Sequence, residues 1–393
     1  MSLPHTGMEP ISVFFAALLV AIILLVYRQA PRQNAVTAVR LASEKWGLSM
    51  DKRRDEELAD RGTHDATEVM PEIKPLPDFR WETTEPARLR PFKPTYHITM
   101  ALQGSTPSEL IVMDRNYRDR VLSRRDIIVQ HERCVLGCTH KGEAAVNELY
   151  SYLVDDYLPV RYPSMFELQL AQDKESSIFL NKVTGLKLPR RAPADAVQSL
   201  KFLGETVEDD MFLLLQREPQ SCEAGEHETV AYVCCHPSGF DPSKKLGKLL
   251  RDVHRPVPAY AKIGPSMEKY FSRLQVGKSA KRVNWSIQTH TNLFAPSGNH
   301  VHEDDEVHEE DDVDITKTMF RVELQTLTRL PRTRAILFSF KTYLYPIAEI
   351  RAEGLGPQLA DAIEGLKTGN APGMWTYKGG VRWGKAVCRF LRS

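Results

Sequence analysis

One histidine stands between an apolar run and a stiff segment. In LLRDVHRPVPAY, residues 249–260, His254 follows the apolar stretch, and Pro256 and Pro258 come shortly after it. Proline fixes its own φ and holds the residue before it extended, so the chain after His254 has little freedom. Such a segment suits an imidazole that must point in one direction, as a metal ligand does. It equally suits a helix that ends at a histidine which caps the last carbonyls.

Residues 321–340 contain a second group of side chains that could bind a ligand or take part in a reaction. The strict alternation of RVELQTL predicts a strand, which places Arg321, Glu323 and Gln325 on one face. Three more arginines follow within residues 329–334. Guanidinium groups present paired, planar donors to carboxylates, so this face favours an anionic ligand. The alternative is a solvated edge strand.

The motifs that the sequence lacks exclude several classes of protein. It contains no G-x-x-x-x-G-K-[ST], G-x-G-x-x-G, G-x-S-x-G or H-E-x-x-H pattern, which argues against phosphate-loop, dinucleotide-binding, α/β-hydrolase and zinc-protease chemistry. The 52 basic and 51 acidic residues nearly cancel and give no general attraction for nucleic acid. The C-x3-C pair at 134–138 and the adjacent cysteines at 234–235 lack a second C-x2-C pair, so no structural zinc site is expected.

The N-terminal region contains a candidate membrane anchor. Residues 11–27, ISVFFAALLVAIILLVY, are 17 uncharged residues in a row. A helix of that length measures about 26 Å, enough for a thin bilayer such as that of the endoplasmic reticulum. The leader, residues 1–10, has no Lys or Arg, whereas Arg28 and Arg32 follow the apolar run. This favours a single uncleaved transmembrane helix with a cytosolic body; a cleaved signal peptide and a luminal body are the alternative.

Beyond the anchor, residues 28–91 are charged or proline-spaced and predict a flexible tether to a domain at 92–393. Within that domain, helical spacing and strand-like runs alternate irregularly, which predicts an α+β fold. Helices are expected at 117–128, 144–158, 244–254, 266–274 and 355–366, and strands at 212–216, 229–235, 321–327 and 335–344.

One segment of the domain is strongly acidic. Residues 300–314, HVHEDDEVHEEDDVD, hold nine acids and three histidines. Such a composition does not bury apolar surface, so a disordered insertion is expected. A weak divalent-metal site is the alternative, although the histidines lack a fixed spacing on a regular element.

Several motifs, in the same chain order, resemble one protein family. They are HPSGFDPSKKLGKLLRDVHRPVPAY at 236–260, R-x-NWSI at 282–287, RVELQTLTRLPRTRAILF at 321–338 and YKGG at 377–380. These resemble the haem-dependent oxidative N-demethylase alpha-subunit-like family, over roughly residues 92–391. The anchor, the tether and the acidic insertion depart from the bacterial pattern, so the chain looks like a fungal or other eukaryotic membrane-attached member.

The resemblance implies a PAS-like α+β core, with a mixed sheet and flanking helices, that binds haem b. It implies oxidation of secondary amines such as dimethylamine by O₂. Electrons would come from NADPH through separate flavin and iron–sulfur subunits, in agreement with the missing nucleotide motifs.

The resemblance also makes His254 the candidate axial ligand of the haem iron. A neutral imidazole on a rigid segment is a common ligand of haem, and a carbonyl or Asp252 would orient its other nitrogen. His236 and His290 are the rivals: the first precedes a proline, and the second follows the NWSI run.

Cationic residues are the natural partners of haem propionates. Arg321 and Arg329 are the first candidates, followed by Lys245 and Arg282. Glu323 is either a catalytic carboxylate, which holds a protonated amine or relays protons to bound oxygen, or the buried partner of Arg321.

Together these observations predict a membrane-anchored haem protein, with its domain on the cytosolic side of the endoplasmic reticulum. Monooxygenase chemistry on a small amine-like substrate is the leading hypothesis. The alternatives are a haem-binding sensor or carrier without turnover, and a catalytically inactive scaffold tethered to the membrane, because a fold alone does not distinguish these roles.

Overall fold

The computed structural model describes residues 72–172, 176–218, 223, 225–301, 305–306 and 313–393. The predicted anchor at 11–27 lies outside the described residues, as does the tether up to residue 71. Within the described part of the chain, no helix is both long and apolar enough to span a membrane.

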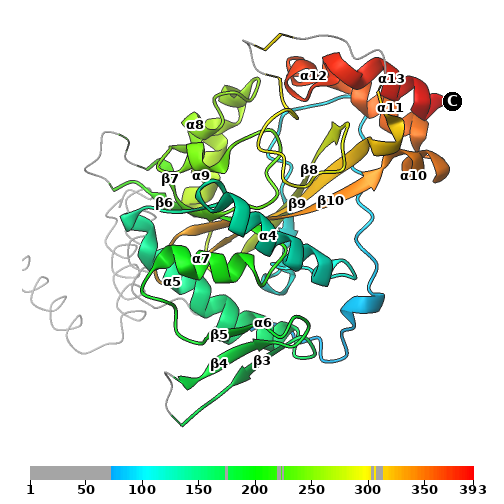
Figure 1. The fold of residues 1–393 in the computed structure, drawn as a ribbon. Helices are drawn as coiled ribbons and strands as arrows, with labels where there is room; N and C mark the ends of the chain where they lie inside the picture. The colour runs from blue at the N-terminus through cyan, green and yellow to red at the C-terminus, as the bar shows by residue number, and fades with distance from the viewer. Residues whose placement is uncertain (1–71, 173–175, 219–222, 224, 302–304, 307–312) are drawn as a thin grey trace, which may run out of the picture. The chain divides into compact units, whose positions relative to one another are not determined.

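A seven-stranded antiparallel sheet, in the order β1-β8-β9-β10-β6-β7-β2, organises the described residues (Figure 1). Its strands are β1 (Gln103–Ser105), β2 (Leu136–Cys138), β6 (Asp210–Gln216), β7 (His227–Val233), β8 (Ser279–Gln288), β9 (Met319–Arg329) and β10 (Ile336–Pro346). Numbered along the chain, the five longer strands run 2-1-5-4-3 across the sheet. The predicted α+β class is confirmed. The expected mixed sheet is wrong, because every strand pair of this sheet is antiparallel.

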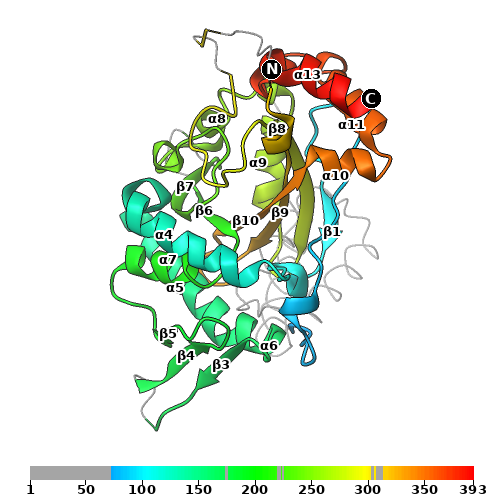
Figure 2. The same cartoon turned by 45° about the vertical axis from the view of Figure 1, so that its right-hand side comes forward.

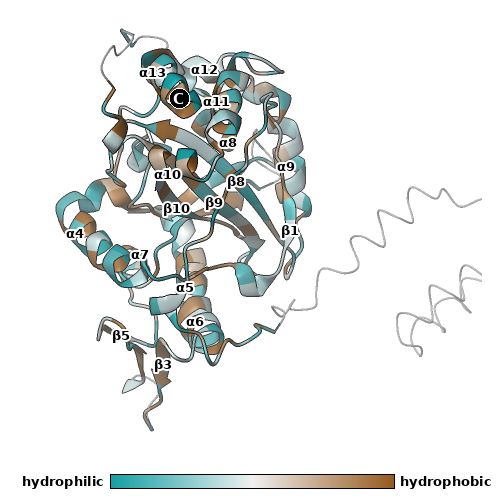
Figure 3. Ribbon diagram, turned by 90° about the vertical axis from the view of Figure 1, so that its right-hand side faces the viewer, coloured by the Kyte–Doolittle hydropathy of each residue, from teal (hydrophilic) through white to brown (hydrophobic). Residues whose placement is uncertain are grey.

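Helices cover both faces of this sheet. The elements α4 (Tyr117–Val135), α5 (Glu143–Ser151) and α7 (Ala196–Gly204) pack on one face, where they build the largest apolar core. On the other face lie α8 (Leu250–Val253) and α9 (Gly264–Arg273). Figure 2 shows α4, α5 and α7 close together beside the strands, and Figure 3 shows α4 and α7 on one side of the strands and α9 on the opposite side.

The remaining elements lie at two ends of the molecule in Figure 1. At one end, α10 (Ile347–Ala352), α11 (Gly356–Glu364), α12 (Met374–Tyr377) and α13 (Gly380–Arg392) enclose a second apolar core. Near the other end, α6 (Leu158–Arg161) precedes a small antiparallel sheet of β3 (Phe166–Gln169), β4 (Ile178–Asn181) and β5 (Lys187–Pro189). Neither the small sheet nor α13 is among the elements expected from the sequence.

The helix expected at 244–254 is wrong in most of its length. Residues Pro242–Lys245 form a 3-10 turn, and only Leu250–Val253 form an α-helical turn, α8. Between them, Gly247 has a φ of +71°, in the left-handed region that glycine adopts without a Cβ penalty. Leu249 forms a β-bridge with Glu228, so the segment is pinned to β7 instead of continuing as a helix.

The folded domain begins earlier than the predicted boundary at residue 92. Ile73 is buried in the large core, and the Lys74 N–H donates to Ser108 Oγ at 2.9 Å. Arg90 forms an ion pair with Glu353 at 2.8 Å. Residues 72–91 therefore pack on the domain, in contrast to the expectation of a tether over that stretch.

The two ends of the acidic segment also pack on the domain. Val301 and Val313 are only 4% and 8% exposed, and the Val301 N–H donates to Tyr377 O at 3.0 Å. The interior of the predicted insertion, at 302–304 and 307–312, lies outside the described residues. The sequence boundary of the insertion thus includes residues that belong to the core.

Candidate functional site

A cavity of about 280 Å³ lies between the sheet and the segment that carries α8 and α9. Strand alternation brings Glu323 and Gln325 of β9 into its wall. The antiparallel register places Asn284 of β8 opposite Glu323, and Arg282 opposite Gln325. These four side chains remain half-buried in a largely buried sheet because they face the cavity.

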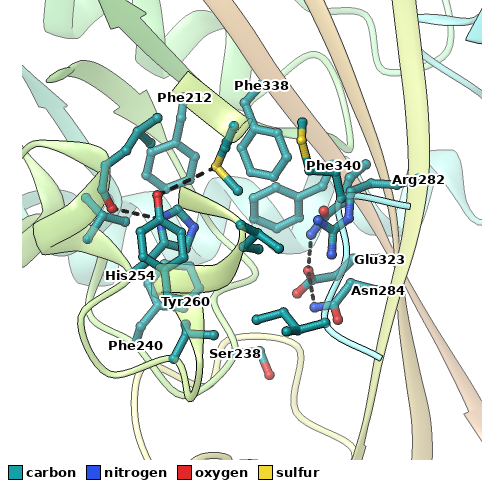
Figure 4. Close-up of a pocket in the computed structure, with 18 of the residues that line it drawn as sticks. Phe212, Ser238, Phe240, His254, Tyr260, Arg282, Asn284, Glu323, Phe338 and Phe340 are labelled. Carbon is teal, nitrogen blue, oxygen red and sulfur yellow. Dashed lines mark hydrogen bonds between the residues drawn. The ribbon is translucent and has the colours of Figure 1, made fainter. Parts of the chain in front are cut away.

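Much of the wall is aromatic. Phe212, Phe338 and Phe340 come from the sheet, while Phe240 and Tyr260 come from the loops around α8 (Figure 4). Aromatic rings offer large, rigid apolar surfaces, and pockets of this kind bind mainly apolar ligands through a few polar anchors.

His254 is held in a defined orientation at this cavity. Its ring stacks on Tyr260, with centroids 4.8 Å apart and an interplanar angle of 6°. Its Nδ1 lies 2.8 Å from the carbonyl oxygen of Leu250. A carbonyl only accepts, so Nδ1 carries the proton, and the neutral ring keeps a lone pair on Nε2. Among the described residues, Nε2 has no hydrogen-bond partner.

The two interpretations of His254 from the sequence thus concern different nitrogen atoms. From the C-cap position of α8, Nδ1 bonds to the carbonyl of Leu250, as a helix-end histidine does. Burial lowers the pKa of His254 to about 4, and the charges of Lys245 and Arg282 act in the same direction, against the hydrogen bond to Leu250. At neutral pH the ring is therefore uncharged, and Nε2 is free to bind a metal.

The polar groups gather on the other side of the cavity from His254 (Figure 4). Glu323 accepts hydrogen bonds from Gln325 Nε2 at 2.8 Å and from Asn284 Nδ2 at 3.4 Å. The guanidinium group of Arg282 makes no hydrogen bond and no ion pair within the described part of the chain. Burial lowers the pKa of Arg282, and the charges of Tyr96 and Glu323 partly oppose that shift.

Lys378 joins this polar group although no sequence argument singled it out for a role. Its Nζ donates to Asn284 Oδ1 at 3.3 Å and to the carbonyl of Trp285. Burial lowers its pKa to about 8; the charge of Glu323 opposes this shift, and that of Arg282 adds to it. The YKGG motif that supplies Lys378 was visible in the sequence, but its position beside Asn284 depends on how α12 returns to the sheet.

Of the predicted propionate partners, Lys245 and Arg282 both line the cavity. Lys245 lies near His254 in the fold, and its Nζ donates to Val253 O at 3.1 Å. Burial lowers the pKa of this lysine. Its side chain also borders a second pocket, which adjoins the cavity through residues such as Phe240 and His300.

Arg321 lines the cavity too, but its guanidinium group is already engaged. It donates to Gln288 Oε1 at 3.2 Å, to Leu293 O at 3.1 Å and to His236 O at 2.5 Å. No ion pair joins it to Glu323 in the described residues, in contrast to one of the two roles considered for that carboxylate. The contacts of Arg321 tie loops to β9.

Arg329 lies outside the cavity lining, unlike the prediction. Its guanidinium group donates to Leu274 O and Arg334 O, both at 2.6 Å, and to Phe271 O. These bonds fasten the end of α9 to β9, a structural role. The burial of this end of the sheet under α9 was not apparent from the sequence.

The rival histidines are placed differently. His236 is 2% exposed and does not line the cavity. His290 has both ring nitrogens engaged: Nδ1 accepts from the Asn292 N–H at 3.2 Å, and Nε2 lies 2.9 Å from Asn299 Oδ1. The geometry therefore favours His254 among the three.

The family comparison agrees with this chemistry. A model of the family described as haem-dependent oxidative N-demethylase, alpha subunit-like, matches residues 101–388. The chain belongs to this family. Haem dependence is thus implied by membership in the N-demethylase family.

The residues of the cavity fit a haem group. An axial ligand needs a neutral imidazole with a free, oriented nitrogen, which His254 provides. The aromatic wall suits a flat macrocycle, and Lys245 supplies a cation beside it for a carboxylate. Within the described residues, no group of three or more His, Cys, Asp or Glu side chains is arranged to hold a metal ion. A haem iron requires no such group, because the porphyrin supplies its other ligands.

Proposed function

We propose that this protein binds haem b through His254 and oxidises an N-methyl group of a small amine with O₂. The observation that carries the proposal is the oriented, neutral imidazole with its free Nε2 at an aromatic cavity. The 2-1-5-4-3 order of the five longer strands supports a PAS-like core.

The reaction requires two electrons from outside the chain. In balanced form, an N-methyl amine, O₂, two electrons and two protons give the demethylated amine, formaldehyde and water. The C–N bond breaks, one oxygen atom enters formaldehyde and the other enters water. A separate NADPH-dependent reductase with flavin and iron–sulfur centres is the proposed donor. When bound, haem supplies the activation of O₂ at its iron, as is general for haem oxygenating enzymes.

The residues of the chain would hold and orient the reactants. Lys245 offers a cation to a haem carboxylate at the margin of the cavity. Glu323, held by Gln325 and Asn284, would accept a hydrogen bond from the protonated amine. The phenylalanines of the sheet exclude water, which strengthens that contact.

A membrane location is part of the proposal, and Asn284 offers a test of its topology. Asn284-Trp285-Ser286 is the only N-x-[ST] pattern in the sequence, and Asn284 lines the cavity. A glycan there would disrupt the site, so we expect the domain on the cytosolic side, where no glycan is added. Full-length protein should fractionate with membranes, show no mass shift with an N-glycan-removing enzyme, and be digested by protease added to sealed microsomes. A glycosylated, protected domain would contradict this topology.

Absorption spectroscopy of the full-length chain tests the haem assignment. We expect a Soret band in the wild type and its loss or shift in His254→Ala. His290→Ala, a rival ligand, and His140→Ala, whose side chain is 95% exposed, serve as controls and should retain the band. A band lost in His290→Ala but kept in His254→Ala would refute the ligand assignment.

Turnover separates an enzyme from a haem sensor. With an added reductase and O₂, formaldehyde should form in a ratio of one to one with the demethylated amine. A stable Soret band without formaldehyde from any N-methyl amine would instead support a sensor or carrier.

A further inference from the structure

The charges around the cavity do not balance. Among the described residues, its lining includes one carboxylate, Glu323, and four cationic side chains, Lys245, Arg282, Arg321 and Lys378. Three of the four cations donate to protein oxygens, as described above. Arg282 alone among these four makes no hydrogen bond within the described part of the chain, and its Nε is buried without a partner. A guanidinium group left unpaired with its Nε buried is costly, so its presence at the cavity favours an anionic ligand.

The position of Arg282 separates it from the proposed haem carboxylate site. Figure 4 shows Arg282 with Asn284 and Glu323 on the far side of the cavity from His254. Lys245, in contrast, lies beside Val253 on the His254 side and borders both the cavity and the adjoining pocket. We therefore assign Lys245 to a haem carboxylate, which leaves Arg282 to another anion.

Arg282 and Glu323 form a receptor for two opposite charges. Arg282 is paired with Gln325 across β8 and β9, so it is diagonal to Glu323, two residues earlier on β9. No ion pair joins the two side chains among the described residues, although the charge of Glu323 raises the pKa of Arg282 against the effect of burial. Both charges thus remain available to a ligand that carries an ammonium group and a carboxylate close together.

We propose that the substrate is an N-methylated amino acid that binds as a zwitterion. Its ammonium group contacts Glu323, and its carboxylate contacts the guanidinium group of Arg282. A simple methylated amine would satisfy Glu323 and leave Arg282 unpaired, whereas the zwitterion pairs both groups. This assignment rests on the proposed function and names the substrate class of the same cavity.

Equilibrium binding to the oxidised, haem-loaded full-length protein, measured by titration calorimetry, tests the proposal without turnover. The probes are N,N-dimethylglycine, dimethylamine, and 3-methylbutanoate, which keeps the carboxylate but replaces the nitrogen with carbon. We expect N,N-dimethylglycine to bind about ten- to a hundredfold more tightly than either analogue, because each analogue lacks one charge-assisted hydrogen bond.

Variants at two positions test which protein side chain binds each charged end of the ligand. Arg282→Gln should weaken N,N-dimethylglycine about ten- to a hundredfold and leave dimethylamine nearly unchanged, and Arg282→Lys should restore only part of the affinity. Glu323→Gln should weaken both amines and leave 3-methylbutanoate nearly unchanged. Arg255→Gln removes a 78% exposed arginine near His254 and is the matched control.

Two results would overturn the proposal. The first is equal affinity of the wild type for N,N-dimethylglycine and dimethylamine. The second is an Arg282→Gln protein that loses haem affinity but keeps its preference for the zwitterion, because the guanidinium group would then serve a haem carboxylate. A wild-type protein without a Soret band would instead contradict the proposed function. Failure of the substrate proposal and failure of the proposed function are therefore distinguishable.

Discussion

Two groups of charges lie on opposite faces of the same sheet and differ in their pairing. On the α4 and α7 side, Lys341 of β10 lies 2.7 Å from Asp114 and 2.8 Å from Glu208, and it donates to Val112 O at 2.9 Å. On the cavity side, Arg282 of β8 has no such partner within the described residues.

This difference separates structural from functional charge. Buried ions are tolerated when partners replace the water they lose, as at Lys341, and such a network only holds the fold together. A charged side chain that lacks partners in the protein can still form its hydrogen bonds and ion pairs with a ligand. For Lys341 and Arg282, pairing rather than burial or charge alone thus distinguishes the structural cation from the one available to a ligand.

The largest loss of stability is expected from a change in the paired group around Lys341. Lys341→Met leaves Asp114 and Glu208 buried without their cation and should lower the free energy of unfolding by about 3–5 kcal/mol. Arg282→Met, on the cavity side, should lower the free energy of unfolding by less than about 1 kcal/mol or raise it, because it removes an unpaired charge whose Nε is buried. Urea denaturation of both variants measures the contrast. Equal destabilisation would show that pairing does not separate the two groups.

Arg329→Met should cause the second-largest loss of stability. Three carbonyls at the end of α9 and after β9 lose their charged donor, which should cost about 2–3 kcal/mol. The haem affinity of the folded fraction should match the wild type, since Arg329 does not line the cavity. A fall in haem affinity without a loss of stability would restore the role predicted for it from the sequence.

The pH dependence of stability reports on His254. Its folded-state pKa, about 4, lies below the ordinary value of 6.5. Between these values the unfolded chain binds the proton and the folded chain does not, so this residue makes stability fall as pH drops from about 6.5 to about 4. In His254→Asn the slope of unfolding free energy against pH should decrease by up to one proton. Parallel curves for the two proteins would contradict the lowered pKa.

The smallest effect is expected in the acidic segment. Replacing residues 302–312 with an equally long Gly/Ser linker should change the unfolding free energy by less than about 1 kcal/mol, because it removes surface contacts such as the 3.7 Å Arg382–Asp305 pair. Val301→Ala, just outside the linker, should cost more, about 1–2 kcal/mol, since Val301 is buried. Urea denaturation compares the two. Marked stabilisation of the intact protein by a divalent cation would instead support the metal site considered for this segment.

The local sequence pattern determined which residues share a strand face and which histidine is oriented. The alternation in RVELQTL predicted that Arg321, Glu323 and Gln325 share a face, and β9 confirms it. The prolines after His254 predicted an oriented histidine, and its bond to Leu250, four residues earlier, is a local contact that a helix end provides. The family motifs predicted haem dependence, which the family match supports. The first two depend on neighbours within a few residues, and the third depends on short motifs that keep their order along the chain.

Only the tertiary structure decided which charges have partners. Arg321, Arg329 and Arg282 look alike in the sequence, yet the first donates to His236 O, 85 residues away, and the second to Leu274 O, 55 residues away. Lys378 reaches Asn284 across 94 residues. Hydrogen bonds over such separations depend on how the loops return to the sheet, and no spacing along the chain encodes that path. The unpaired state of Arg282 became visible only once every possible neighbour among the described residues had been placed.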